Sequence, residues 1–200
     1  MNLLDQRRTP KICISSELSH GGLEIYNNNL SLKGYGGYRS ALSTHGLLSG
    51  NFYYEAQIES KSGNIRLGFG QKNTDIYAPA GYDKYSYSYG DANGYIFHNS
   101  VRKTYSDTYK YKDIIGVLLS INTEPTVLKD YTRSTLVLDS SLKFVSRFSF
   151  IKFFKNGEDL GIAFSNINPG IYHAVVSLYC GGEVSLNFGP FFAYPIDNHI

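Results

Sequence analysis

The stretch SFIKFFKNGEDLGIAFSNI, residues 149–167, carries a clear hairpin signal. Two apolar runs flank Asn156-Gly157, a pair that is favoured where the two central residues of a tight turn need positive φ. The stretch therefore predicts a β-hairpin. IYHAVVSLYCGGEVSLNFG, residues 171–189, has a similar pattern, and we expect a second hairpin that turns at Gly181-Gly182.

Alternation of apolar and polar residues predicts further strands. In NFYYEAQIE, residues 51–59, every second residue from Phe52 is apolar, and Glu55 on the opposite face is expected to meet solvent. DIIGVLLSI, residues 113–121, is almost wholly apolar and predicts a strand buried on both faces. The two glycines of IRLGFGQ, residues 65–71, indicate a close approach of backbones or a bulge. Many short strands with glycine-rich turns predict an all-β sandwich of two antiparallel sheets.

The chain of 200 residues is long enough for one domain with a substantial core. We expect an N-terminal arm at 1–17 and a single domain at 18–200. Residues 122–149 read as a long insertion, which in a compact β domain is usually functional or disordered.

Composition limits the function classes. The net charge is only +2, so bulk attraction to nucleic acid or membrane is not indicated. No apolar run approaches the roughly 18–20 residues of a membrane helix, and the N-terminus lacks the apolar stretch of a signal peptide. We expect an intracellular protein without a membrane contact.

Sequence signals for catalysis are weak. The histidines and cysteines lack metal-ligand spacing, and the usual nucleophile, zinc and phosphate-loop motifs are absent, so no metal or cofactor is expected. Glu55 and Glu59 are the carboxylates to consider for glycoside hydrolysis, which sandwich folds can host. A carbohydrate-active enzyme or a lectin is therefore kept as a remote alternative.

Residues 61–112 carry the strongest binding signal. They hold nine of the 18 tyrosines and eight basic against four acidic side chains, a local charge of +4. Basic groups among aromatic rings favour an acidic peptide, because arginine binds carboxylates bidentately and tyrosine offers flat walls. Stacking of single-stranded nucleic acid, or a merely solvated tyrosine-rich sheet, would fit the same pattern. Within GYDKYSYSYG, residues 81–90, alternation places Tyr85, Tyr87 and Tyr89 on one face, where we expect them to pack.

Several motifs resemble a known family. FKNGEDLGIAFSNI, YHAVVSLY and VSLNFG resemble the C-terminal half of a SPRY domain. Five further segments are similar to the SPRY domain of the Ash-two family: GYRSALSTHGLLSGNFYYE (37–55), RLGFGQ (66–71), APAGYDKYSYSYGD (78–91), YIFHNS (95–100) and FGPFFAYP (188–195). The resemblance covers roughly residues 18–196.

The resemblance implies a concanavalin A-like sandwich without catalytic chemistry, in a nuclear subunit of the COMPASS or MLL histone H3 lysine methyltransferase assemblies. The implied partners are an acidic motif of the retinoblastoma-binding WD-repeat subunit and, through it, the SET-domain methyltransferase. A weak contact of loop lysines with nucleosomal DNA is a secondary expectation. The family's peptide-binding residues match Tyr38, Arg66, Pro79 and Tyr82. A generic SPRY adaptor with another peptide partner, for example in ubiquitin ligation, is the runner-up.

Arg66 is the expected anchor for a carboxylate, with an ion pair inside the domain as the alternative, and core packing is the alternative for Tyr82. Departures from the family limit the transfer. Gly90 stands where relatives carry an arginine, and the candidates to replace that charge are Arg39, Arg102 and Lys103. Phe69 and Tyr89 stand at positions where the family often has tryptophan. We expect no counterpart of the family's Dpy-thirty-binding tail.

Overall fold

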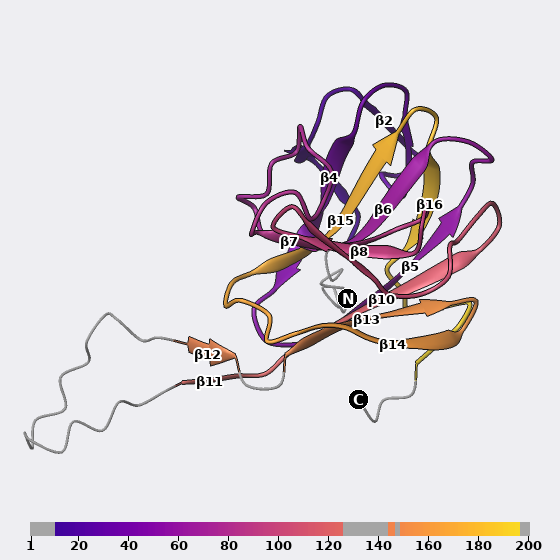
Figure 1. Ribbon diagram of the computed structural model, residues 1–200. Helices are drawn as coiled ribbons and strands as arrows, with labels where there is room; N and C mark the ends of the chain where they lie inside the picture. Colours follow the sequence, from indigo (N-terminus) through magenta and orange to yellow (C-terminus); the bar gives the residue numbers. More distant parts are fainter. Residues whose placement is uncertain (1–10, 126–143, 147–148, 197–200) are drawn as a thin grey trace, which may run out of the picture.

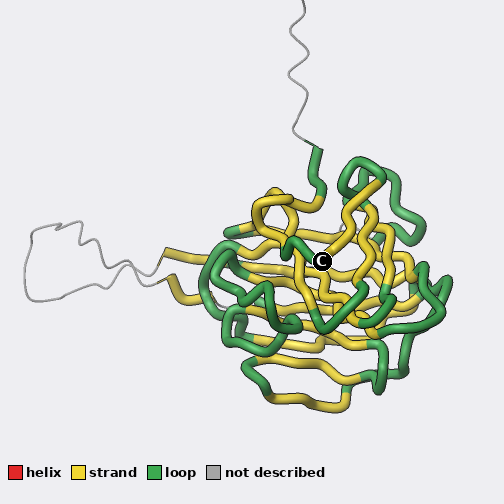
Figure 2. Tube along the Cα trace, turned by 90° about the horizontal axis from the view of Figure 1, so that it is seen from above, coloured by secondary structure: helices red, strands yellow, loops and turns green. Residues whose placement is uncertain are grey.

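The computed structural model describes residues 11–125, 144–146 and 149–196. These residues form strands and loops, and no helix among them could cross a membrane. Two seven-stranded antiparallel sheets, here called sheet A and sheet B, pack face to face as a curved sandwich (Figures 1 and 2). The all-β sandwich expected from the alternation is confirmed.

Sheet A contains, in spatial order, β1 (Ile14–Ser19), β4 (Arg39–Leu47), β15 (Tyr172–Tyr179), β6 (Asn64–Gly70), β7 (Ser86–Gly90), β8 (Tyr95–His98) and β9 (Val101–Thr104). Sheet B contains β14 (Glu158–Ser165), β13 (Phe150–Lys155), β10 (Ile114–Ile121), β5 (Gly50–Ile58), β16 (Glu183–Asn187), β3 (Ser31–Gly34) and β2 (Leu23–Tyr26). A small pair, β11 (Thr123–Pro125) and β12 (Phe144–Ser146), lies to one side of the sandwich (Figure 1).

The hairpin predicted at 149–167 is confirmed. Strands β13 and β14 pair antiparallel, with Lys155 opposite Glu158. Asn156 and Gly157 form the turn with φ of 51° and 85°, as the left-handed conformation of such turns requires.

The second predicted hairpin is wrong. Strand β15 pairs with β4 and β6 in sheet A, whereas β16 pairs with β3 and β5 in sheet B. The glycines at 181 and 182 therefore carry the chain from one sheet to the other. Alternation shows which face of a strand is apolar, but it does not show which strand lies beside it.

The core lies between the two sheets. Tyr54, Phe69 and Phe153 are among its largest fully buried side chains. The apolar alternation in β5 is confirmed, and Leu118 and Leu119 of β10 are both fully buried although they point to opposite faces. The close approach of backbones predicted from the glycines of residues 65–71 is confirmed. A Cβ at Gly68 would collide with the Tyr87 carbonyl of the neighbouring strand.

The ends of the domain and its insertion are partly described. β1 begins at Ile14, inside the expected arm, and pairs with β4. Within the expected insertion at 122–149, β11 and β12 form a ladder, and residues 126–143 and 147–148 lie outside the described residues.

The expectation of a solvated Glu55 is wrong, because Glu55 is only 2% exposed. Residues 188–196 are here called the C-terminal strap. The backbone N–H groups of Ala193 and Tyr194 in this strap donate hydrogen bonds of 2.8 and 2.7 Å to the two carboxylate oxygens of Glu55. Asn187 donates a third hydrogen bond of 3.2 Å. The strap follows β5 by more than 100 residues, so only the folded chain brings these donors to Glu55.

Candidate peptide-binding surface

Arg66 lies on the outer face of sheet A, because its β6 neighbours Ile65 and Leu67 enter the core. Its guanidinium carbon is 3.6 Å from the centroid of the Phe97 ring and 5.1 Å from that of Tyr38. Its Nη1 donates a hydrogen bond of 3.2 Å to the Ala80 carbonyl. Two rings and one carbonyl thus fix the guanidinium in place.

No carboxylate of the described residues forms an ion pair with Arg66, although the nearby Asp91 and the Tyr38 hydroxyl stabilise its charge. Lys33–Glu183, Lys152–Asp159 and Lys155–Asp113 are the ion pairs within the described residues, so Arg66 takes part in none of them. Burial lowers the pKa of Arg66, and an arginine nevertheless stays charged at neutral pH. Burial also raises the pKa of the Tyr38 hydroxyl, an effect that the Arg66 charge partly offsets. The alternative of an internal ion pair is not what the structure shows.

The loop between β6 and β7 brings Pro79 and Tyr82 to the same surface. Ser88 of β7 donates to the Ala80 carbonyl at 2.6 Å, and the Gly81 amide donates to Ser86 at 2.8 Å. These bonds lay the loop across the sheet beside Arg66. Pro79 is half-buried there, and Tyr82 is 56% exposed, so Tyr82 does not fill the core.

Gly90 pairs directly with Arg66 across the β6–β7 ladder. A Cβ at Gly90 would lie 3.0 Å from the Phe97 ring and 3.6 Å from the Arg66 side chain. The place next to Gly90 is therefore filled by the ring that stacks on Arg66. The Phe97 ring occupies the space that a side chain at position 90 would need.

The three candidate compensating charges lie in different environments. Arg39 donates from Nη1 to the carbonyl of Tyr38 at 2.7 Å. In the β8–β9 ladder Arg102 is opposite Phe97, and its guanidinium carbon lies 5.3 Å from the centroid of the Tyr95 ring. Lys103 is opposite the core residue Ile96. Directly paired residues share a face, so Arg102 is on the outer face and Lys103 is not.

Two aromatic residues of this surface were missed in the sequence. Phe97 stacks on Arg66, and Tyr179 of β15 packs against Tyr38 with ring centroids 5.0 Å apart. Tyr179 is 37% exposed, although its strand is otherwise buried. Alternation within β8 and β15 shows that Phe97 and Tyr179 lie on one face of their strands. It places them beside Arg66 only when the sheet and the strand order are known.

The tyrosines of β7 serve the core instead. Tyr87 and Tyr89 are buried between the sheets, which confirms their expected packing role. Tyr85 precedes the strand, is half-buried, and carries Lys84 above its ring at 5.2 Å. Tyr85 is therefore not part of that packed face.

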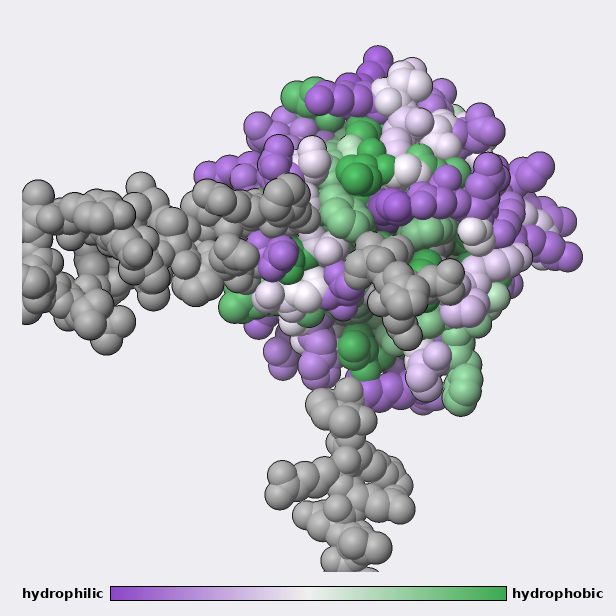
Figure 3. All heavy atoms as spheres, turned by 90° about the horizontal axis from the view of Figure 1, so that it is seen from below, coloured by the Kyte–Doolittle hydropathy of each residue, from purple (hydrophilic) through white to green (hydrophobic). Residues whose placement is uncertain are grey.

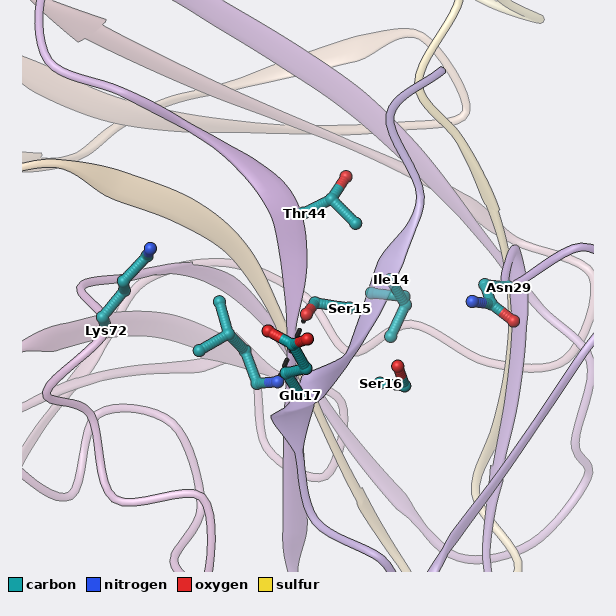
Figure 4. A pocket seen from close by; sticks show the side chains of 8 residues that line it. Ile14, Ser15, Ser16, Glu17, Asn29, Thr44 and Lys72 are labelled. Atoms are coloured by element: carbon teal, nitrogen blue, oxygen red, sulfur yellow. Dashed lines mark hydrogen bonds between the residues drawn. The ribbon is translucent and has the colours of Figure 1, made fainter. Parts of the chain in front are cut away.

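Two hollows of the described residues lie apart from the residues predicted for peptide binding. One, between β1 and the start of the β6–β7 loop, is lined by polar residues that include Glu17, Thr44 and Lys72 (Figure 4). None of the residues predicted for peptide binding lines it. A view from below the sandwich shows separate apolar patches among hydrophilic residues, with no broad apolar face among the described residues in that view (Figure 3).

The carboxylates kept for catalysis are not arranged as a pair. Glu55 is held by the C-terminal strap, and Glu59 lies beyond the end of β5 with its amide bonded to the Glu183 carbonyl. Neither lines the hollow of Figure 4 or a second hollow that Ser60, Asp91 and Tyr109 border. No cluster of metal-ligating side chains was found in that part of the chain.

The fold and the sequence of this chain resemble those of SPRY domains. A family model described as SPRY domain matches residues 51–127. The crystal structure of the SPRY domain of human HERC1 aligns with a TM-score of 0.65 over 90% of this chain and 99% of that one, and its 17% identity speaks for the fold alone.

Among curated proteins, the chain is 33% identical to the Set1/Ash2 histone methyltransferase complex subunit ASH2 of Drosophila melanogaster, over 86% of this chain and 35% of that protein. It is 28% identical to the Set1 complex component ash2 of Schizosaccharomyces pombe, over 79% of this chain and 32% of the relative. Ran-binding protein 9 of Xenopus tropicalis is 28% identical over 94% of this chain and 31% of its own length. The resemblance to the SPRY domain of the Ash-two family is thereby confirmed, and the chain spans about a third of the length of these relatives.

Proposed function

We propose that this chain is a non-catalytic interaction subunit whose SPRY domain binds an acidic linear motif. The observation that carries the proposal is the Arg66 guanidinium, which forms no ion pair with the described residues and which Phe97 and Tyr38 hold at the surface of sheet A. A fixed, partly desolvated guanidinium binds a carboxylate more strongly than a fully hydrated one, because less solvent and less rotamer freedom are lost. Pro79 and Tyr82 form the adjacent wall.

The complex we propose is a nuclear, Set1-type histone methyltransferase assembly. Support comes from the relatives whose names place them in such complexes. The acidic motif then belongs to a WD-repeat subunit, through which the domain would support the SET-domain methyltransferase. A contact with nucleosomal DNA stays a prediction, which the salt dependence of nucleosome binding would test.

The second candidate is an adaptor for a different peptide. Similarity to Ran-binding protein 9 of several vertebrates, at 26–28% identity over 92–98% of this chain, favours it. The two candidates share the peptide surface and differ in the partner, so partner identity decides between them.

Calorimetric titration with an acidic peptide tests the binding site. We expect Arg66→Ala to cost about 2 kcal/mol of binding free energy, in the range of an interface hot spot. Arg66→Lys keeps the charge and loses the planar fork, so we expect it to bind more weakly than wild type as well. Equal affinities of wild type and Arg66→Ala would overturn the anchor assignment.

Affinity capture from native extract tests the complex. Wild type should recover WD-repeat and SET-domain subunits, identified by mass spectrometry, and Arg66→Ala should not. Recovery of other partners in their place, again dependent on Arg66, would favour the second candidate.

A further inference from the structure

The outer face of sheet A carries a row of two aromatic rings that extends from Arg66 to a second cation. Phe97 and Tyr95 are two residues apart on β8, so they share that face, and their ring centroids are 6.4 Å apart. The guanidinium carbon of Arg102, on β9, lies 5.3 Å from the centroid of the Tyr95 ring. The row therefore runs from Arg66 through two rings to a second guanidinium.

Arg102 stands at an accessible end of this row. Strand β9 is the edge of sheet A, and all four of its residues are exposed. No ion pair within the described residues includes Arg102. An exposed arginine on a ring keeps its N–H edge available for a carboxylate.

The spacing between the two arginines limits what can bind both. Strands β6 and β9 are three places apart in the sheet, which corresponds to about 14 Å at the usual strand spacing. An extended peptide advances about 3.3 Å per residue, so about four residues cover that distance.

We propose that Arg102 is a second anion-binding residue of this surface, and that the ligand is an extended peptide with two acidic groups about four residues apart. The inference rests on the proposed function and adds the length and charge pattern of the motif. Of the three candidates Arg39, Arg102 and Lys103, the proposal assigns to Arg102 the positive charge that relatives carry at the position of Gly90.

A peptide fits this row better than single-stranded nucleic acid. Proteins that bind single-stranded nucleic acid let the bases stack on free faces of aromatic side chains. Here Phe97 already carries Arg66 on one face, and Tyr95 carries Arg102. Binding of an oligothymidylate that is tighter than that of the peptides and depends on Arg102 would overturn the peptide assignment.

The test uses three synthetic peptides of equal length in calorimetric titrations of the whole chain. One has a single Asp-Glu pair, one has two pairs about four residues apart, and one has two pairs about eight residues apart. Wild type should bind the peptide with the shorter spacing about twofold to fivefold more tightly than the single-pair peptide, as expected for one added exposed charge contact.

Arg102→Gln should abolish that gain and keep the single-pair affinity. Lys103→Gln, the neighbouring cation on the other face, should retain the gain. The proposal is overturned if Arg102→Gln keeps the gain, or if wild type binds both two-pair peptides equally. If binding depends on Arg66 but not on spacing, this inference fails and the proposed function stands. If wild type binds none of the peptides, both fail.

Discussion

The guanidinium carbon of Arg66 lies 3.6 Å from the centre of the Phe97 ring, in van der Waals contact with its face. The two residues come from β6 and β8, and the strand between them contributes Gly90 directly opposite Arg66. Because glycine has no side chain, the ring can lie across β7 and reach the guanidinium. One N–H of Arg66 is bound to the Ala80 carbonyl, and the Tyr38 hydroxyl lies close enough to interact with the guanidinium, which has further N–H donors for a ligand.

The stack predicts a role for Phe97 in binding. We expect Phe97→Leu to weaken the binding of an acidic peptide by about 1 kcal/mol, because the guanidinium loses the ring that orients it. Calorimetry measures the change. Tyr77→Leu removes an aromatic ring that is 68% exposed and packs against His20, and it should leave affinity unchanged. Equal losses in the two variants would contradict a specific role for Phe97.

The contact of Gly90 with Phe97 predicts coupling between the two positions. We expect Gly90→Ala to lower the free energy of unfolding by about 1 kcal/mol, because the new methyl group pushes the ring aside. In a Phe97→Ala background the same change should cost little, since the obstacle is gone. Urea unfolding of the four proteins gives the coupling energy. Strictly additive effects would show that the ring and the glycine are independent.

We expect the buried Glu55 carboxylate to hold the C-terminal strap against sheet B. Glu55→Gln exchanges one acceptor oxygen for an NH₂ group that would face a backbone N–H of the strap. We expect a loss of about 1–3 kcal/mol in unfolding free energy, the cost of a buried polar group without its partner. Faster hydrogen exchange at the amides of Ala193 and Tyr194 should accompany it.

The half-buried Glu59 provides the matched control for that variant. Glu59→Gln should change neither the unfolding free energy nor the exchange rates. If Glu55→Gln exchanges as slowly as wild type at both amides, Glu55 does not hold the strap.

His173 predicts a pH dependence of stability. It is 2% exposed, its Nδ1 donates to the Ser43 carbonyl at 2.7 Å, and its Nε2 makes no hydrogen bond with the described residues. Burial lowers the pKa of His173 in the folded chain, so the folded state takes up a proton less readily than the unfolded state. The stabilisation is therefore complete above about pH 6.5, the pKa of an unfolded histidine, and is lost as pH falls toward the folded pKa.

Unfolding free energies between about pH 5 and pH 8 check this prediction. His173→Asn keeps a donor for the Ser43 carbonyl and cannot titrate, so its profile should be flatter than that of wild type. Parallel profiles would assign the pH dependence to other groups.

Parts of the candidate site could be predicted from the sequence, and others could not. Tyr38, Arg66, Pro79 and Tyr82 were predicted from the resemblance to the Ash-two family, and the structure brings these four residues to one surface. Phe97 and Tyr179 join that surface from strands distant in sequence, so their roles depend on strand order. The charges at 39, 102 and 103 could not be ranked, because neighbouring residues of a strand point to opposite faces and the register was unknown.

The sequence alone determined the local features of this protein. Asn156-Gly157 determined one turn through its tolerance of positive φ, and the alternation in β5 determined which side chains enter the core. Contacts between distant segments placed β15 and β16 in opposite sheets, buried Glu55 under the strap and brought Phe97 onto Arg66. The physical reason is that periodicity encodes the environment of each face, whereas pairing between distant strands is settled by the packing of the whole sandwich.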